Sequence, residues 1–220
     1  MTVEQMKIKY GDEKVLCIPR ECYEESLGWV KNYSYPILCC DIGNDGEFKL
    51  RYEVEQDEKW LQVIPYVVVK CEDEYFITKR LGGDPRLQGM VAYVGGHVNP
   101  CDYVGAYLDM TSLNADGTLH SCVLRELEEE VGLSCTLIKN NKCVDVFVDE
   151  RAPVSRVHIC ALVIVEIHER FKDSVQVIET DKLEGDWATL EELEQFMNSG
   201  KMEGWCEIAT KKLLNLKEDK

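Results

Sequence analysis

The sequence predicts an α/β fold in which a mixed β-sheet is flanked by helices. Apolar runs of strand length alternate with helical patterns, but without the even strand-helix-strand rhythm of a parallel sheet. The 220 residues suffice for one large domain, or for a domain of about 150 residues with an extra lobe. An apolar content of 45%, with few prolines and glycines, is typical of a globular chain with a packed core.

The charge and the apolar runs argue against several classes of partner. A formal net charge of -16 repels nucleic-acid backbones and anionic membranes, so we expect neither a nucleic-acid polymer nor a membrane as partner.

The longest apolar run, residues 159–167, is too short to cross a bilayer, and the N-terminus has no signal-peptide pattern. Eleven cysteines, an odd number, favour reduced thiols over disulfides. We therefore expect a cytoplasmic protein.

The first 60 residues are expected to form a small α+β extension. The patterns indicate a strand near Lys14–Pro19, a short helix near Glu21–Val30 and a polar turn at Asn44–Gly46. This segment carries no recognisable motif. We therefore place a domain boundary near residue 60, between an extension at residues 1–60 and a main domain at residues 61–220.

The main domain is expected to begin with a β-hairpin. Two apolar runs, Leu61–Val69 and Tyr75–Thr78, flank the polar turn Glu72–Glu74. A further strand, Met90–Val94, ends at the pair Gly95-Gly96. The loop that follows, residues 97–117, is long for a compact domain, and such loops are often functional.

A helix from Leu119 to Val131, closed by Gly132, follows the long loop. Beyond it, a strand at Val157–Ile167 shows apolar residues at every second position, with His158 on the opposite face. This histidine is expected to line a cleft or to be buried and hydrogen-bonded. The remaining elements are a strand at Thr136–Val148 and helices at Thr189–Asn198 and Trp205–Leu216.

The helix carries a cluster of acids beside its apolar stripe. At 100° per residue, Glu126, Glu129 and Glu130 lie next to the stripe, whereas Glu128 points away. Three carboxylates at the margin of a core repel one another and lose hydration unless they share a cation. Oxygen ligands favour Mg²⁺ or Mn²⁺ over zinc. The alternative is an ordinary solvated helix face. The stripe comprises Leu119, Cys122, Val123, Leu127 and Val131.

The segment Arg125–Leu133 resembles the second half of the Nudix box, G-x5-E-x7-R-E-U-x-E-E-x-G-U, in which U is a bulky aliphatic residue. All seven constrained positions of this half match. Strict spacing fails in the first half, where Gly117 stands at the glutamate position. With Gly96 as the opening glycine, Asp102 takes that position, and the 22 residues 103–124 replace seven, an insertion of 15.

The resemblance implies a Nudix-type α/β/α sandwich with a mixed sheet over roughly residues 61–200, ending in the typical segment Trp187–Leu193. It implies Mg²⁺- or Mn²⁺-dependent hydrolysis of a diphosphate linkage in a nucleoside diphosphate derivative or related phosphorylated metabolite. The chain is similar to a bacterial phosphoesterase-like group within this family. The resemblance also allows a homodimer through residues 1–60.

The resemblance also implies roles for individual residues. Glu126, Glu129 and Glu130 would bind the metal, together with the backbone carbonyl of Gly96. Glu126, Glu129 and Arg125 would be catalytic. Glu126 would be a further ligand or the base, a role that a later loop can also supply in this family, and Arg125 would orient Glu129. The residues expected to contact the substrate are Arg80, His97 and Asp102.

Two other functions remain open at the level of the sequence. A Nudix fold can bind a nucleotide or sugar phosphate as a regulator without hydrolysing it, although the complete set of acids argues against this. An isomerase of the isopentenyl diphosphate type would need a reactive cysteine, for which Cys101 is a distant candidate. The sequence contains no C-x2-C pair, no P-loop and no Gly-x-Gly-x-x-Gly, so we expect neither structural zinc held by cysteines nor a dinucleotide fold.

Overall fold

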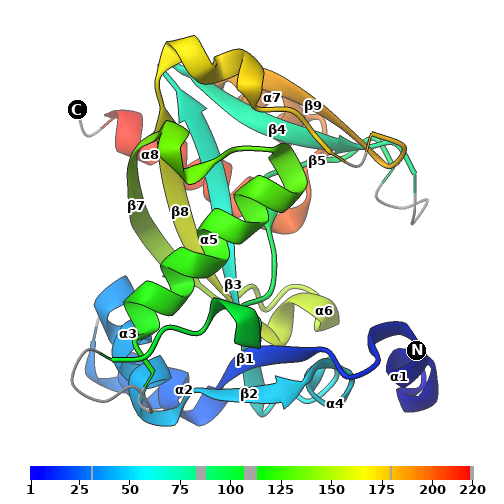
Figure 1. The fold of residues 1–220 in the computed structure, drawn as a ribbon, viewed down its shortest axis with the longest axis vertical. Helices are drawn as coiled ribbons and strands as arrows, with labels where there is room; N and C mark the ends of the chain where they lie inside the picture. Colours follow the sequence, from blue (N-terminus) through cyan, green and yellow to red (C-terminus); the bar gives the residue numbers. More distant parts are fainter. Residues whose placement is uncertain (31, 83–87, 107–112, 179, 219–220) are drawn as a thin grey trace. The chain divides into compact units, whose positions relative to one another are not determined.

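The computed structural model describes residues 1–30, 32–82, 88–106, 113–178 and 180–218 (Figure 1). The chain divides into two compact units. Unit 1 comprises Met1–Pro65, Gly96–Val123 and Val144–Ala161. Unit 2 comprises Tyr66–Gly95, Leu124–Cys143 and Leu162–Lys220. Within the described residues, no helix has both the length and the apolar character that crossing a membrane requires.

Unit 1 is organised around the buried strand β1. This strand pairs antiparallel with β2, where Leu16 lies opposite Phe48, and with the first residues of β3, where Ile18 lies opposite Leu61. The expected strand and helix are confirmed, the helix one residue earlier at each end. The elements are α1 (Val3–Tyr10), β1 (Lys14–Pro19), α2 (Arg20–Trp29), α3 (Tyr35–Asp45), β2 (Glu47–Leu50), α4 (Arg51–Val54), a 3-10 helix η1 (Pro100–Asp102) and α6 (Pro153–Arg156).

The turn expected at Asn44–Gly46 is wrong, because α3 continues to Asp45 and Gly46 is its C-cap. A proline in the first turn of α3 sets the helical φ at the start. Leu38 and Ile42, four residues apart, are the buried residues of this helix. This one-turn spacing of apolar residues is the helical signal that the polar residues at its end had obscured.

Unit 2 contains the predicted hairpin. Strand β3 (Trp60–Cys71) turns through two residues into β4 (Glu74–Arg80), and Lys70 lies opposite Tyr75. Strand β9 (Leu183–Thr189), which the sequence pattern did not indicate, pairs antiparallel with all of β4 (Figure 1). Helix α7 (Leu190–Asn198) follows with a capping box at Thr189, and α8 (Gly204–Glu218) ends the described chain.

The strand expected at Met90–Val94 is wrong as a single element. It forms two short strands with different partners: β5 (Val91–Ala92) pairs with β4, and β6 (Val94–Gly95) pairs with β3. Two residues per partner are too few to leave a periodic pattern in the sequence.

Two further strands complete the sheet pairings. Strand β7 (Ile138–Phe147) pairs with β8 (His158–Ile167), and β8 pairs with β3. The strand expected from Thr136 begins two residues later, after the 3-10 helix η2 (Cys135–Leu137). The one-sided pattern expected for β8 is also wrong, since Cys160 and Leu162 on the second face are as buried as Ile159. The strands and helices together give the α/β Nudix fold that the sequence predicts.

Helix α5 (Ala115–Val131) begins four residues before its expected start and ends at the expected residue. All five residues of its apolar stripe are buried. Gly132 follows with φ 64°, and its N–H donates to the carbonyl of Glu128. The N–H of Leu133 donates to the carbonyl of Leu127, which completes a glycine-dependent helix end.

Gly132→Ala should therefore lower the free energy of unfolding by about 1–2 kcal/mol, because a Cβ is strained at positive φ. The contact that an added Cβ would make, 3.4 Å to Ile178 Cδ1, is close to ordinary. The measurement is urea denaturation. Gly43→Ala is the matched control, since Gly43 lies inside α3 with open space around it and should gain about 0.5–1 kcal/mol. Equal effects at the two sites would contradict the argument.

Candidate functional site

Arg125 joins two carboxylates of α5. Its Nη1 donates to Oε1 of Glu126 at 2.8 Å and to Oε2 of Glu129 at 3.0 Å. Glu126 is buried, with a side chain 10% exposed, whereas the side chain of Glu129 is 60% exposed. The guanidinium offsets part of the cost of burying Glu126 and restricts the rotamers of both acids. This is the arrangement expected of an orienting arginine.

The local sequence explains why the acids face as they do. Burial of Leu127 and Val131 fixes the rotation of α5, and Glu126 is drawn into the margin of the core. Glu128 points outward and is exposed, and Glu130 is half-buried. Glu126 and Glu130 therefore lie one turn apart and are both at least partly buried. Glu128, in contrast, is an ordinary surface residue.

Arg80, at the end of β4, is held by an acid within unit 2. Its Nε donates to Oε1 of Glu203 at 2.5 Å. This hydrogen bond is the main reason that the pKa of the Arg80 guanidinium is raised, and the charge of Glu130 contributes to the same shift. Arg80 therefore lies within electrostatic reach of one acid of α5. Its proposed contact with substrate stays a prediction.

Asp102 has a structural partner in unit 1. The residue is 1% exposed, and Oδ2 accepts a hydrogen bond from the N–H of Asn99 at 2.8 Å. The carboxylate thus caps the short helix η1 in a reciprocal pair with Asn99. The capping accounts for the position of Asp102 in the loop, and its role toward a substrate stays a prediction.

His97 lies directly after Gly96 in unit 1. Its Nε2 is 2.9 Å from Oε1 of Gln62, a fully buried side chain. Loss of hydration lowers the pKa of His97 well below the usual range, and the charges of Arg51 and His158 act in the same direction. The carbonyl of His97 accepts a hydrogen bond from Sγ of Cys122, in the middle of α5, at 3.6 Å. His97 is therefore a neutral imidazole at neutral pH.

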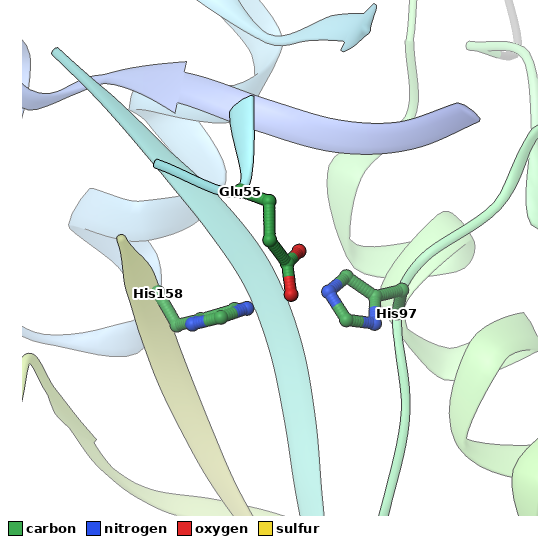
Figure 2. A group of neighbouring side chains, drawn as sticks. All are labelled: Glu55, His97 and His158. Carbon is green, nitrogen blue, oxygen red and sulfur yellow. The ribbon is translucent and has the colours of Figure 1, made fainter. Parts of the chain in front are cut away.

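A second cluster in unit 1 brings His97 together with Glu55 and His158 (Figure 2). One ligand atom from each side chain lies within 4.8 Å of the others. Sequence reasoning missed Glu55 and treated His158 as a cleft or core histidine. The three residues are far apart in the chain, with no motif spacing between them, so no pattern in the sequence could have joined them.

The acids of α5 differ in chemistry from the cluster of Glu55 and the two histidines, and among the described residues only that cluster has three ligand atoms within 4.8 Å of one another. Glu126, Glu129 and Glu130 offer only carboxylate oxygens, with one guanidinium holding two of them, and this set fits a hard cation such as Mg²⁺ or Mn²⁺. The carbonyl of Gly96, the fourth expected ligand, belongs to unit 1 and stays a prediction from the sequence.

Comparison with known proteins assigns the chain to a family. The NUDIX domain model matches residues 60–205. Protein YmaB of Bacillus subtilis (strain 168) is 30% identical over 206 residues, which cover 90% of this chain and 95% of that protein.

The solved structures agree with this assignment. The crystal structure of Tm1382, provisionally named a Nudix hydrolase, aligns with a TM-score of 0.74 at 30% identity, covering 93% of this chain and all of that one. A NUDIX hydrolase from Alicyclobacillus acidocaldarius shares the fold with a TM-score of 0.51 at 13% identity, covering 69% of this chain and 90% of that one. The chain therefore belongs to the Nudix hydrolases, a family of pyrophosphohydrolases.

Proposed function

We propose that this protein hydrolyses a diphosphate linkage in a nucleoside diphosphate derivative or a related phosphorylated metabolite, with Mg²⁺ or Mn²⁺ as the required cation. The observation that carries the proposal is the set of three acids on α5, of which Arg125 holds Glu126 and Glu129. The net negative charge of the protein repels a polyanionic substrate, and a cation held by these carboxylates would offset that repulsion.

Glu126, Glu129 and Glu130 would hold the cation, with the carbonyl of Gly96 as a further proposed ligand. Once bound, the cation supplies Lewis acidity that draws negative charge away from the phosphate oxygens. Arg125 keeps two of the carboxylates in fixed rotamers, so little reorganisation is needed when substrate arrives.

The chemical step needs a base. A water oxygen attacks one phosphorus in line, the bridging P–O bond breaks, and the water proton passes to a carboxylate. We assign this proton to Glu126 or Glu129. Glu126 is the more buried of the two, whereas Glu129 is more accessible to solvent.

Arg80 and His97 are proposed to bind the substrate directly, and Asp102 is proposed to act through the loop that carries it. Arg80 would release Glu203 and bind the substrate phosphate instead. A guanidinium can donate two parallel hydrogen bonds to two oxygens of one phosphate group. His97, as a neutral imidazole, would contact the substrate without adding charge. Asp102 would keep the loop after Gly96 in shape through its cap on η1.

The test is a panel of nucleoside diphosphate sugars, nucleoside triphosphates, dinucleoside polyphosphates and coenzyme A derivatives. The protein is first stripped with EDTA and then assayed with and without added Mg²⁺. We expect release of two phosphorylated products from at least one class when Mg²⁺ is present. Without the cation, the hydrolysis rate should fall below about 1% of the rate with Mg²⁺. Ligand binding without turnover on every class would favour a regulatory role, and isomerised product without phosphate release would favour the isomerase.

A further inference from the structure

We propose that Glu55, His97 and His158 form a binding site for a single Zn²⁺ ion in unit 1, made of residues other than the acids of α5. The three ligand atoms lie within 4.8 Å of one another. They come from the residue after α4, the loop after β6 and the first residue of β8. Figure 2 shows the Glu55 carboxylate between the two imidazoles, with a ring nitrogen of each turned toward it.

The hydrogen bond of His158 fixes its proton in the position that metal binding requires. Nδ1 lies 2.7 Å from the backbone carbonyl of Val154, and a carbonyl can only accept, so Nδ1 carries the hydrogen. Nε2 therefore presents its lone pair. Imidazoles that ligate zinc commonly donate their second N–H to a backbone carbonyl in this way, because the bond sets the tautomer and the ring orientation.

The carboxylate of Glu55 is also held by neighbours. The hydroxyl of Tyr10 donates to Oε1 at 2.9 Å, and Nε of Arg51 lies 3.5 Å from Oε2. Arg51 is in turn paired with Glu13 at 3.1 Å. The two acids and the arginine sum to one negative charge. The immediate surroundings of the site are therefore net anionic, despite the guanidinium.

His97 also makes a hydrogen bond to Gln62. The amide nitrogen of Gln62 faces the carbonyl of Val54 at 3.5 Å, so its oxygen faces His97 and accepts from Nε2–H. Binding of the metal through Nε2 exchanges this hydrogen bond for a metal bond and moves the proton to Nδ1. Binding through Nδ1 leaves the hydrogen bond intact.

The chemistry of the ligands selects the ion. Two imidazole nitrogens and one carboxylate oxygen suit zinc, which takes three protein ligands and leaves a fourth position open in catalytic sites. Mg²⁺ prefers oxygen ligands throughout. Tetrahedral ligands of zinc stand about 3.3 Å from one another, so closure of the site requires side-chain shifts on the order of 1 Å. The alternative is a buried pair of hydrogen-bonded histidines with no ion.

The experiment is zinc titration of the EDTA-stripped full chain against a chromophoric chelator, followed by cobalt substitution. We expect one Zn²⁺ bound with a dissociation constant below about 1 μM. The cobalt spectrum should lack a thiolate charge-transfer band, which excludes the cysteines as ligands. Zinc, but not the same concentration of Mg²⁺, should also raise the midpoint of thermal unfolding.

Variants locate the site. His158→Ala and Glu55→Gln should each weaken zinc binding by about 100-fold or more. His168→Ala is the matched control, because His168 is exposed, and Glu129→Gln controls for the acids of α5. Glu55→Gln keeps nearly the same shape, so it tests the site even if His158→Ala folds poorly. Absence of one tightly bound equivalent, or unchanged affinity in both variants, would overturn the proposal whether or not the protein hydrolyses diphosphates.

Discussion

Glu129→Gln is expected to lower kcat/KM on the preferred diphosphate substrate by about 10²–10³-fold, which corresponds to about 2.7–4 kcal/mol of lost transition-state stabilisation. The change keeps the size of the side chain but removes one negative charge from the proposed ligand set. It also removes the ion pair between Arg125 and Glu129, so the position of Glu126 loses part of its support. Steady-state kinetics at saturating Mg²⁺ give the measurement.

The matched control for this variant is Glu128→Gln. Glu128 lies on the same helix, carries the same charge and is exposed, but it points away from the cluster. Its replacement should change kcat/KM by less than about twofold, since a solvated charge contributes little at this distance. If both variants lose activity equally, the effect comes from the net charge of the helix, and the proposed role of Glu129 is wrong.

Leu127→Ala is expected to lower the free energy of unfolding by about 2–5 kcal/mol. Leu127 is fully buried and lies between the two acids that Arg125 joins. Its removal leaves a cavity beneath the helix that carries the site, and the surrounding core can close only part of it. Urea denaturation followed by far-UV circular dichroism measures the change.

The comparison for Leu127→Ala is Glu128→Ala at the neighbouring exposed position, which should stay within about 0.5 kcal/mol of the parent protein. A loss below about 1 kcal/mol for Leu127→Ala would mean that the helix is not anchored by its apolar stripe. In that case the rotation of α5, and with it the orientation of the acids, would have another cause.

Local patterns in the sequence predicted the elements whose signals are local. The apolar stripe and Gly132 defined the end of α5, and the alternation of apolar residues with turn residues defined the hairpin of β3 and β4. Strand β9 was missed because its exposed residues Glu184, Gly185 and Asp186 interrupt any apolar pattern, and its conformation is set by pairing with β4. Tertiary pairing of this kind leaves no periodic trace in a single sequence.

The candidate sites divide along the same line. The acids of α5 lie within one turn and a half of one helix, so their spacing along the chain is enough to predict that they lie close together. Glu55, His97 and His158 come together only because the chain returns three times to the same place. The position of a single histidine or glutamate in the sequence does not predict which side chains will lie beside it, so this proximity is found only in the folded structure.

Unit 1 is made of three separate stretches of chain, and this limits how the protein can evolve. Strands β3, β7 and β8 and helix α5 each contribute residues to both units. No single cut in the gene separates one unit from the other, and neither can be transplanted as one continuous block. Such an arrangement is expected to be inherited whole, with variation confined to substitutions and to loop length rather than to exchange of modules.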